Sequence, residues 1–146
     1  MLQKDDAEHS VPERLRSTFR QIVEAFVRGD YQLRKHSIVG VRPVQPDTAK
    51  WIAESISAYG DTLAPLSEQT WDRSIYRWMD GHWMALVDLT TASEPVSDLA
   101  LHACPFPPLH RSCTDHWPRR VGLEARSTLW GHCRGSGAQQ ADCLAC

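Results

Sequence analysis

Long hydrophobic runs are missing from this sequence. No stretch approaches the roughly 18 consecutive apolar residues that a membrane-spanning helix requires. The opening segment, MLQKDDAEHS, is polar and acidic with no apolar stretch behind it, so we expect neither a signal peptide nor a transit peptide. The sequence therefore predicts a cytoplasmic protein that is not bound to a membrane and whose cysteines are reduced.

Motifs of common catalytic and nucleotide-binding sites are also missing. The sequence contains no Gly-rich phosphate loop, no dinucleotide fingerprint and no HExxH. A net charge of −2 and a pI of about 6.4 give no electrostatic footprint for nucleic acid. With 146 residues, 42% of them hydrophobic, the chain is long enough for one domain with a genuine core.

Cysteine is absent from residues 1–103, and all five cysteines lie in residues 104–146. The same segment has no Lys, Ile, Tyr or Met, but it has five Arg, four Pro and four Gly. Its charged residues, five basic and three acidic, give +2, whereas residues 1–103 have 11 basic and 15 acidic and carry −4. The sequence thus predicts a disordered leader over 1–9, a compact domain over 10–103 and an atypical Cys/Pro/Arg-rich tail over 104–146. Translation of a GC-rich gene out of frame also produces such a composition, so the tail need not be native in-frame sequence.

Two helices are predicted in the first half of the chain. Ser10-Val11-Pro12-Glu13 has the pattern of a capping box, and Gly29 is the expected stop of the helix that follows. Asp47 is the expected cap of a second helix, which ends at Gly60. Residues 37–42 are compatible with a short strand. Apolar residues recur every three or four positions in both helices: Leu15, Phe19, Ile22, Val23, Phe26 and Val27 in the first, and Ala49, Ile52, Ala53 and Ile56 in the second.

Three strand-like runs follow between residues 74 and 102. Asp80-Gly81 joins the first two, and an Asp-Gly pair between apolar residues indicates a two-residue hairpin. Such a loop pairs positions whose numbers sum to 161, which places Trp78 opposite Trp83 and Arg73 opposite Asp88. The second strand is apolar on both faces, so both faces should be covered. We predict an α+β fold, with two amphipathic helices packed on a three- or four-stranded antiparallel meander and an irregular Cys-rich tail.

The order of these elements resembles a known family. Tyr59-Gly60, then Thr70-Trp71, Ser74, Trp78, Trp83, Val87-Asp88-Leu89 and Ser97-Asp98-Leu99 follow one another. This succession is similar to a small bacterial family known only as a domain of unknown function, with a TW…S…W…W…VDL.T..E..SDL meander. The resemblance covers residues 10–103 and implies a compact α+β domain, with one more ordinary strand after the run at 97–102. It implies no activity.

Three groupings of residues are candidates for chemistry. Cys113-x2-His116 and Cys143-x2-Cys146 have zinc-ligand spacing, so zinc is the one possible cofactor. Asp72, Asp88, Glu94 and Asp98 are candidates for a carboxylate cluster of an enzyme, but pairing of Asp88 with Arg73 and backbone capping by Asp98 favour structural roles. A Cys104–His102 nucleophile pair has no orienting third group.

Tryptophans suggest a different site. Trp71, Trp78 and Trp83, with Arg73, Asp88 and Asp98, are a candidate binding surface, although packing in the core or at its rim is the favoured alternative. The sequence favours a non-catalytic module that binds another protein, with a profile like that of bacterial immunity proteins. A zinc-stabilised module using the tail and an enzyme with the carboxylate cluster remain alternatives, and the oligomeric state is left open.

Overall fold

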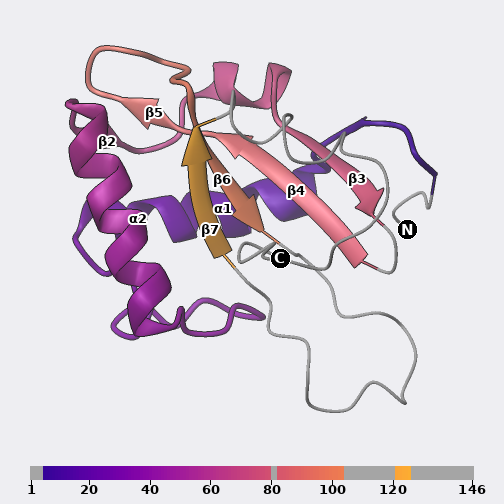
Figure 1. Ribbon diagram of the computed structural model, residues 1–146. Coiled ribbons are helices and arrows are strands. Elements are labelled where there is room, and N and C mark those ends of the chain that lie inside the picture. The colour runs from indigo at the N-terminus through magenta and orange to yellow at the C-terminus, as the bar shows by residue number, and fades with distance from the viewer. Residues whose placement is uncertain (1–4, 80–81, 104–120, 126–146) are drawn as a thin grey trace, which may run out of the picture.

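The protein has the predicted α+β fold, with two helices and an antiparallel sheet (Figure 1). The computed structural model describes residues 5–79, 82–103 and 121–125. The sheet has the strand order β1-β3-β4-β6-β7, and β2 and β5 form a small second ladder. The helices are α1 (Glu13–Val27), α2 (Pro46–Tyr59) and the short 3-10 helix η1 (Glu68–Asp72); the strands are β1 (His9–Ser10), β2 (Leu63–Ala64), β3 (Ile75–Met79), β4 (His82–Asp88), β5 (Thr90–Thr91), β6 (Leu99–Ala103) and β7 (Val121–Ala125).

The predicted hairpin register is confirmed. Trp78 lies opposite Trp83 and Ile75 opposite Leu86, so every pair between β3 and β4 sums to 161. The turn itself, at residues 80–81, lies outside the described residues. The two tryptophan rings meet edge to face with centroids 4.8 Å apart, a favourable geometry for aromatic pairs.

Helix α1 begins differently from the prediction. Ser10 does not cap it, because Ser10 pairs with Ile75 in the sheet and is thereby held extended, three residues before the helix. Pro12 occupies the N-cap position without a side-chain hydrogen bond. The helix ends as expected: Gly29 has a φ of +84°, and its N–H donates to Phe26 O at 2.9 Å.

Helix α2 begins two residues earlier than predicted. Gln45 is its N-cap residue and Pro46 its first residue, because the fixed φ of proline suits the first helical position. Asp47 therefore lies in the first turn rather than at the cap. Gly60 ends the helix with a φ of +83°, as predicted. The possible strand at residues 37–42 is not formed; a turn closed by Val41 N–H to Ile38 O, 3.0 Å, lies there instead.

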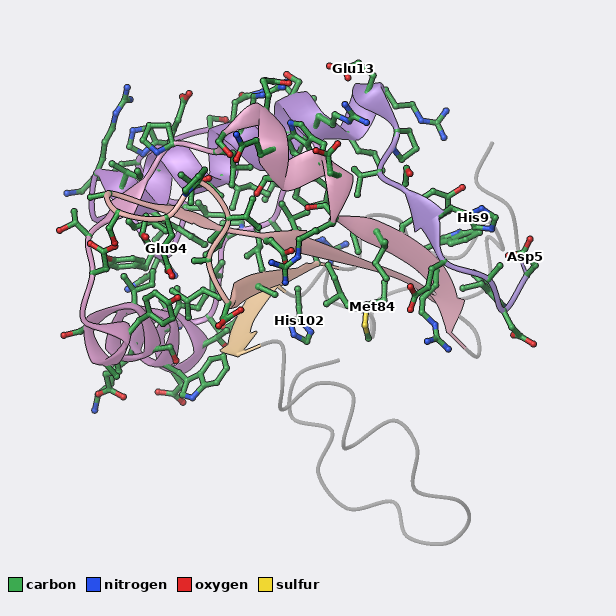
Figure 2. All side chains as sticks on the ribbon, turned by 90° about the horizontal axis from the view of Figure 1, so that it is seen from above. Asp5, His9, Glu13, Met84, Glu94 and His102 are labelled. Carbon is green, nitrogen blue, oxygen red and sulfur yellow. The ribbon has the colours of Figure 1, made fainter. Side chains whose placement is uncertain are left out.

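Strand alternation divides the buried side chains between the two faces of the sheet. One face meets α1 and includes Val87 and Leu101, which share a core with Phe19, Ile22 and Phe26. Met84 and His102 point to the opposite side, away from α1 (Figure 2). Met84 and Leu86 are buried on that second face, so both faces of β4 are covered, as predicted.

Two strands lie outside the predicted domain boundaries. His9, which we assigned to the leader, pairs with Tyr76 at one edge of the sheet. Beyond residue 103, β7 pairs with β6 in antiparallel register, for example Gly122 with His102. The backbone of this strand therefore supplies the further strand that the family resemblance implied, although the composition of the tail gave no sign of it. Helix α2 lies against β7 (Figure 1).

We predict that Phe26→Ala destabilises the protein by about 3–5 kcal/mol, because it removes a large buried side chain and leaves a cavity. Phe26 is 1% exposed, whereas its neighbour Val27 is 40% exposed. Urea denaturation measures the difference, and Val27→Ala is the matched control, expected to change stability by less than about 0.5 kcal/mol. Equal unfolding midpoints for the two variants would show that the stripe of α1 does not anchor the fold.

Candidate binding pocket

The tryptophans of the candidate binding surface lie in or beside the core. Trp71 is 4% exposed and Trp83 is 6% exposed, and Trp78 packs half-buried against the core. Two guanidinium groups lie over the Trp71 ring, those of Arg16 and Arg20, at 5.3 and 5.2 Å from its centroid. Trp71 and Trp83 are therefore packed in the core and Trp78 at its rim.

Arg73 and Asp88 form the predicted ion pair. Arg73 Nε lies 3.1 Å from Asp88 Oδ2, with 46% of the arginine side chain exposed and only 1% of the aspartate. The backbone of Asp88 is also hydrogen-bonded. Its N–H donates to Ser74 Oγ at 3.2 Å, and Ser74 Oγ donates to Thr70 O at 2.7 Å. These bonds give Asp88 a structural role, because they join β4 to η1.

The four candidate carboxylates are not brought together. Asp72 is exposed on η1, and Glu94 instead accepts a 2.5 Å hydrogen bond from the hydroxyl of Tyr59, which raises the pKa of that tyrosine. Asp98 is exposed, and its predicted capping role falls to the preceding residue: Ser97 Oγ accepts from Leu99 N–H at 3.3 Å. Among the described residues, no group of three or more His, Cys, Asp or Glu side chains is placed to hold a metal.

The remaining candidates concern the tail. Cys104, Cys113, His116, Cys143 and Cys146 lie outside the described residues, so the zinc prediction stays a prediction. His102 is 4% exposed, and burial lowers the pKa of its imidazole to about 4, which keeps the ring neutral near pH 7.

A pocket of about 430 Å³ lies where the chain leaves α1 and enters α2. This volume is within the range of ligand pockets. One wall is the segment 29–35, and the other is the first half of α2, which approaches it at the lower end of that helix in Figure 1. The described lining residues are Gly29, Asp30, Tyr31, Gln32, Arg34, Lys35, Pro46, Ala49, Lys50 and Ala53.

Asp30 shapes the first wall. Its buried carboxylate accepts hydrogen bonds from the N–H groups of Arg34, Lys35 and His36, at 3.2, 2.9 and 3.0 Å. These bonds hold a tight turn in which Leu33 takes a left-handed φ of +55°, a conformation that costs a residue with a Cβ about 1–2 kcal/mol. Arg34 and Lys35, whose backbone N–H groups are bound by this one carboxylate, both line the pocket.

His36 completes this arrangement. Its Nδ1 lies 2.9 Å from Asp30 Oδ2, and its Nε2 lies 3.3 Å from Arg28 Nη1. The imidazole of His36 thus bridges the Asp30 carboxylate and the Arg28 guanidinium. Burial by itself raises the pKa of Asp30, but the hydrogen bonds from His36 and the three backbone N–H groups outweigh burial and lower it.

The sequence did not single out this pocket. Its one local signal is the basic run Arg34-Lys35-His36 directly after a helix stop and an aspartate. Nothing in that run indicates that Lys50, fifteen residues beyond Lys35, lines the same pocket. The juxtaposition follows from the path between the helices, where Val44 N–H donates to Gln32 O at 2.8 Å.

The fold and its pocket define a small α+β domain with a preformed ligand-sized hollow. The chain belongs to the family described as domain of unknown function (DUF7668), which matches residues 23–106. That match begins within α1 and ends just beyond β6, and it includes the whole pocket. No curated protein and no solved structure matches the chain. In the described part of the chain, no helix is long and apolar enough to cross a membrane.

We predict that Asp30→Asn destabilises the protein by about 1–3 kcal/mol, the cost of leaving buried hydrogen-bonding groups without their acceptor. The carboxylate accepts at both oxygens, from Arg34 N–H at Oδ1 and from Lys35 N–H, His36 N–H and the His36 ring at Oδ2, whereas an amide keeps only one acceptor oxygen. Asp72→Asn is the control, because Asp72 is exposed. The urea midpoint of each variant is the measurement, and an Asp30→Asn midpoint equal to that of the control would contradict the role given to Asp30.

Proposed function

We propose that this domain is a non-catalytic module that binds another protein at the pocket between segment 29–35 and α2. The observation that supports the proposal is the pocket itself, a hollow of about 430 Å³. Its walls are held by the helix stop at Gly29, the turn around Asp30 and the first turns of α2. A preformed site lowers the ordering cost of association.

The chemistry of the lining supports binding rather than catalysis. The described lining residues include no Ser, Thr, Cys or His. Their one carboxylate, Asp30, is already bonded to three backbone N–H groups and an imidazole, with its pKa lowered, and such a group is a poor proton acceptor. Arg34, Lys35 and Lys50 are groups that recognise a ligand by charge and hydrogen bonding.

The proposal is tested by filling the pocket. Random peptides displayed on phage are selected on the protein, and the affinities of the selected peptides are then measured by fluorescence anisotropy. We expect Ala53→Trp to weaken binding at least about tenfold, because a bulky ring occupies space that the peptide needs. Ala58→Trp, also on α2 but exposed and outside the pocket, is the matched control and should bind like the unchanged protein.

Thermal melts of both variants establish that they are folded. Selected peptides that bind Ala53→Trp and the unchanged protein equally would contradict the proposal, as would a selection that enriches no peptide.

A further inference from the structure

We infer that the pocket binds an acidic segment of a partner protein, with adjacent Asp or Glu carboxylates contacting Arg34, Lys35 and Lys50. This inference rests on the proposed function and names the chemistry of its partner. It follows from the charged side chains that line the pocket and from the hydrogen bonds and ion pairs that each of them makes.

Two of the three cations have no partner in the described part of the chain. Arg34 and Lys35 are exposed, and their side chains make no ion pair or hydrogen bond there, although their backbone N–H groups are bound to Asp30. Lys50 pairs only loosely with Glu54, at 3.8 Å with both side chains mostly exposed, and such surface pairs contribute little. All three are therefore available to an incoming anion.

The start of α2 adds to this positive field. The helix has Pro46 at its first position and no side-chain hydrogen bond at its cap, so its first N–H groups are left for other acceptors. Asp47 in the first turn offsets part of that field. The negative charge of Asp30 is spread over four hydrogen bonds on the inner side of the turn. The net effect of the lining charges, three basic and one acidic, favours an anion.

The local charge is opposite to that of the rest of the domain. Residues 1–103 carry −4 in total, so a long polyanion such as nucleic acid would meet repulsion beyond the pocket. A short acidic segment places its charges only within the hollow. Ala49, Ala53 and Pro46 form an apolar part of the lining, which suits the methylene groups of glutamate and the backbone of a peptide better than a bare inorganic ion.

The acidic residues near the start of this chain lie elsewhere. Asp5 and the strand β1 that follows it run beside β3, whereas α2 lies at the opposite side of the sheet, next to β7 (Figure 1). Within one molecule, this acidic segment therefore does not occupy the pocket. A separate protein chain is the occupant that the arrangement favours.

The probe is a fluorescein-labelled peptide of six alternating Asp and Glu residues, titrated with the protein at low and high salt. We expect saturable binding that weakens at high salt, since exposed charges are screened. Lys35→Glu and Lys50→Glu should each weaken binding at least about tenfold, because they place a like charge against the ligand. Arg14→Glu changes the net charge equally on exposed α1 surface outside the pocket, and its affinity should stay within about twofold of the unchanged protein.

Several results would overturn the inference. Equal loss of affinity in Arg14→Glu would show nonspecific charge attraction, and equal binding of the Asn/Gln version of the peptide would show that charge is not recognised. Inorganic phosphate that binds as tightly as the peptide would identify a small-anion site. A dimer of the protein alone that dissociates in Lys50→Glu would make a second copy the occupant.

The outcome is separable from that of the proposed function. Neutral peptides that are selected on the protein and lost in Ala53→Trp would uphold the pocket as a protein-binding site while overturning its preference for acidic segments.

Discussion

The burial of the α1 stripe against one face of the sheet is the interaction on which the rest of this structure depends. Phe19, Ile22 and Phe26 lie on the apolar side of a helix whose opposite side is polar, and such a helix is stable in water mainly through burial of its apolar side. Because side chains alternate along β4, Val87 and its same-face neighbours meet this stripe while Met84 and Leu86 cover the other side. The register of the hairpin is fixed by the same division, since a shift of one residue would exchange the two faces.

The end of α1 sets the position of the pocket. Phe26 in the core contacts the ring of Tyr31 at a centroid distance of 5.7 Å, so the residues just after the helix are anchored to the core. Asp30 lies between them, and its N–H donates to Ala25 O at 2.9 Å while its carboxylate organises the turn beyond. The pocket thus adjoins residues that are anchored to the core, and the backbone of Arg34 and Lys35 is held by hydrogen bonds to Asp30. Rigid support of this kind is what a binding site requires.

Much of the fold could be predicted from the sequence, because local patterns determine it. The apolar spacing of α1 predicts a helix, and the Asp-Gly pair between β3 and β4 predicts a hairpin. Both structures form among residues that are close in the sequence. The two cap assignments were wrong, since Ser10 is held by a strand pairing and Pro46 begins α2, and both effects depend on context beyond the cap pattern. The strand β7 was implied only by the family resemblance, because the composition of residues 104–146 is unlike that of an ordinary strand.

The candidate site could not be predicted in the same way. The tryptophans and carboxylates drew attention because of their chemistry, but most were buried, paired or separated, which only the packing decides. The pocket depends on Leu33 in a left-handed conformation, and nothing in a leucine signals it. It also depends on a connection that brings Lys50 to the same hollow as Arg34. Both are tertiary properties.

The central claim is that ligand recognition takes place at this pocket and not on the tryptophan-bearing sheet. Its most direct test is a titration of the ¹⁵N-labelled protein with the acidic peptide, followed by backbone amide chemical shifts. The account predicts that the largest changes fall in segment 29–35 and the first half of α2, with small changes at Trp78 and Trp83. Changes concentrated on β3 and β4, with none around Asp30 and Lys50, would contradict it.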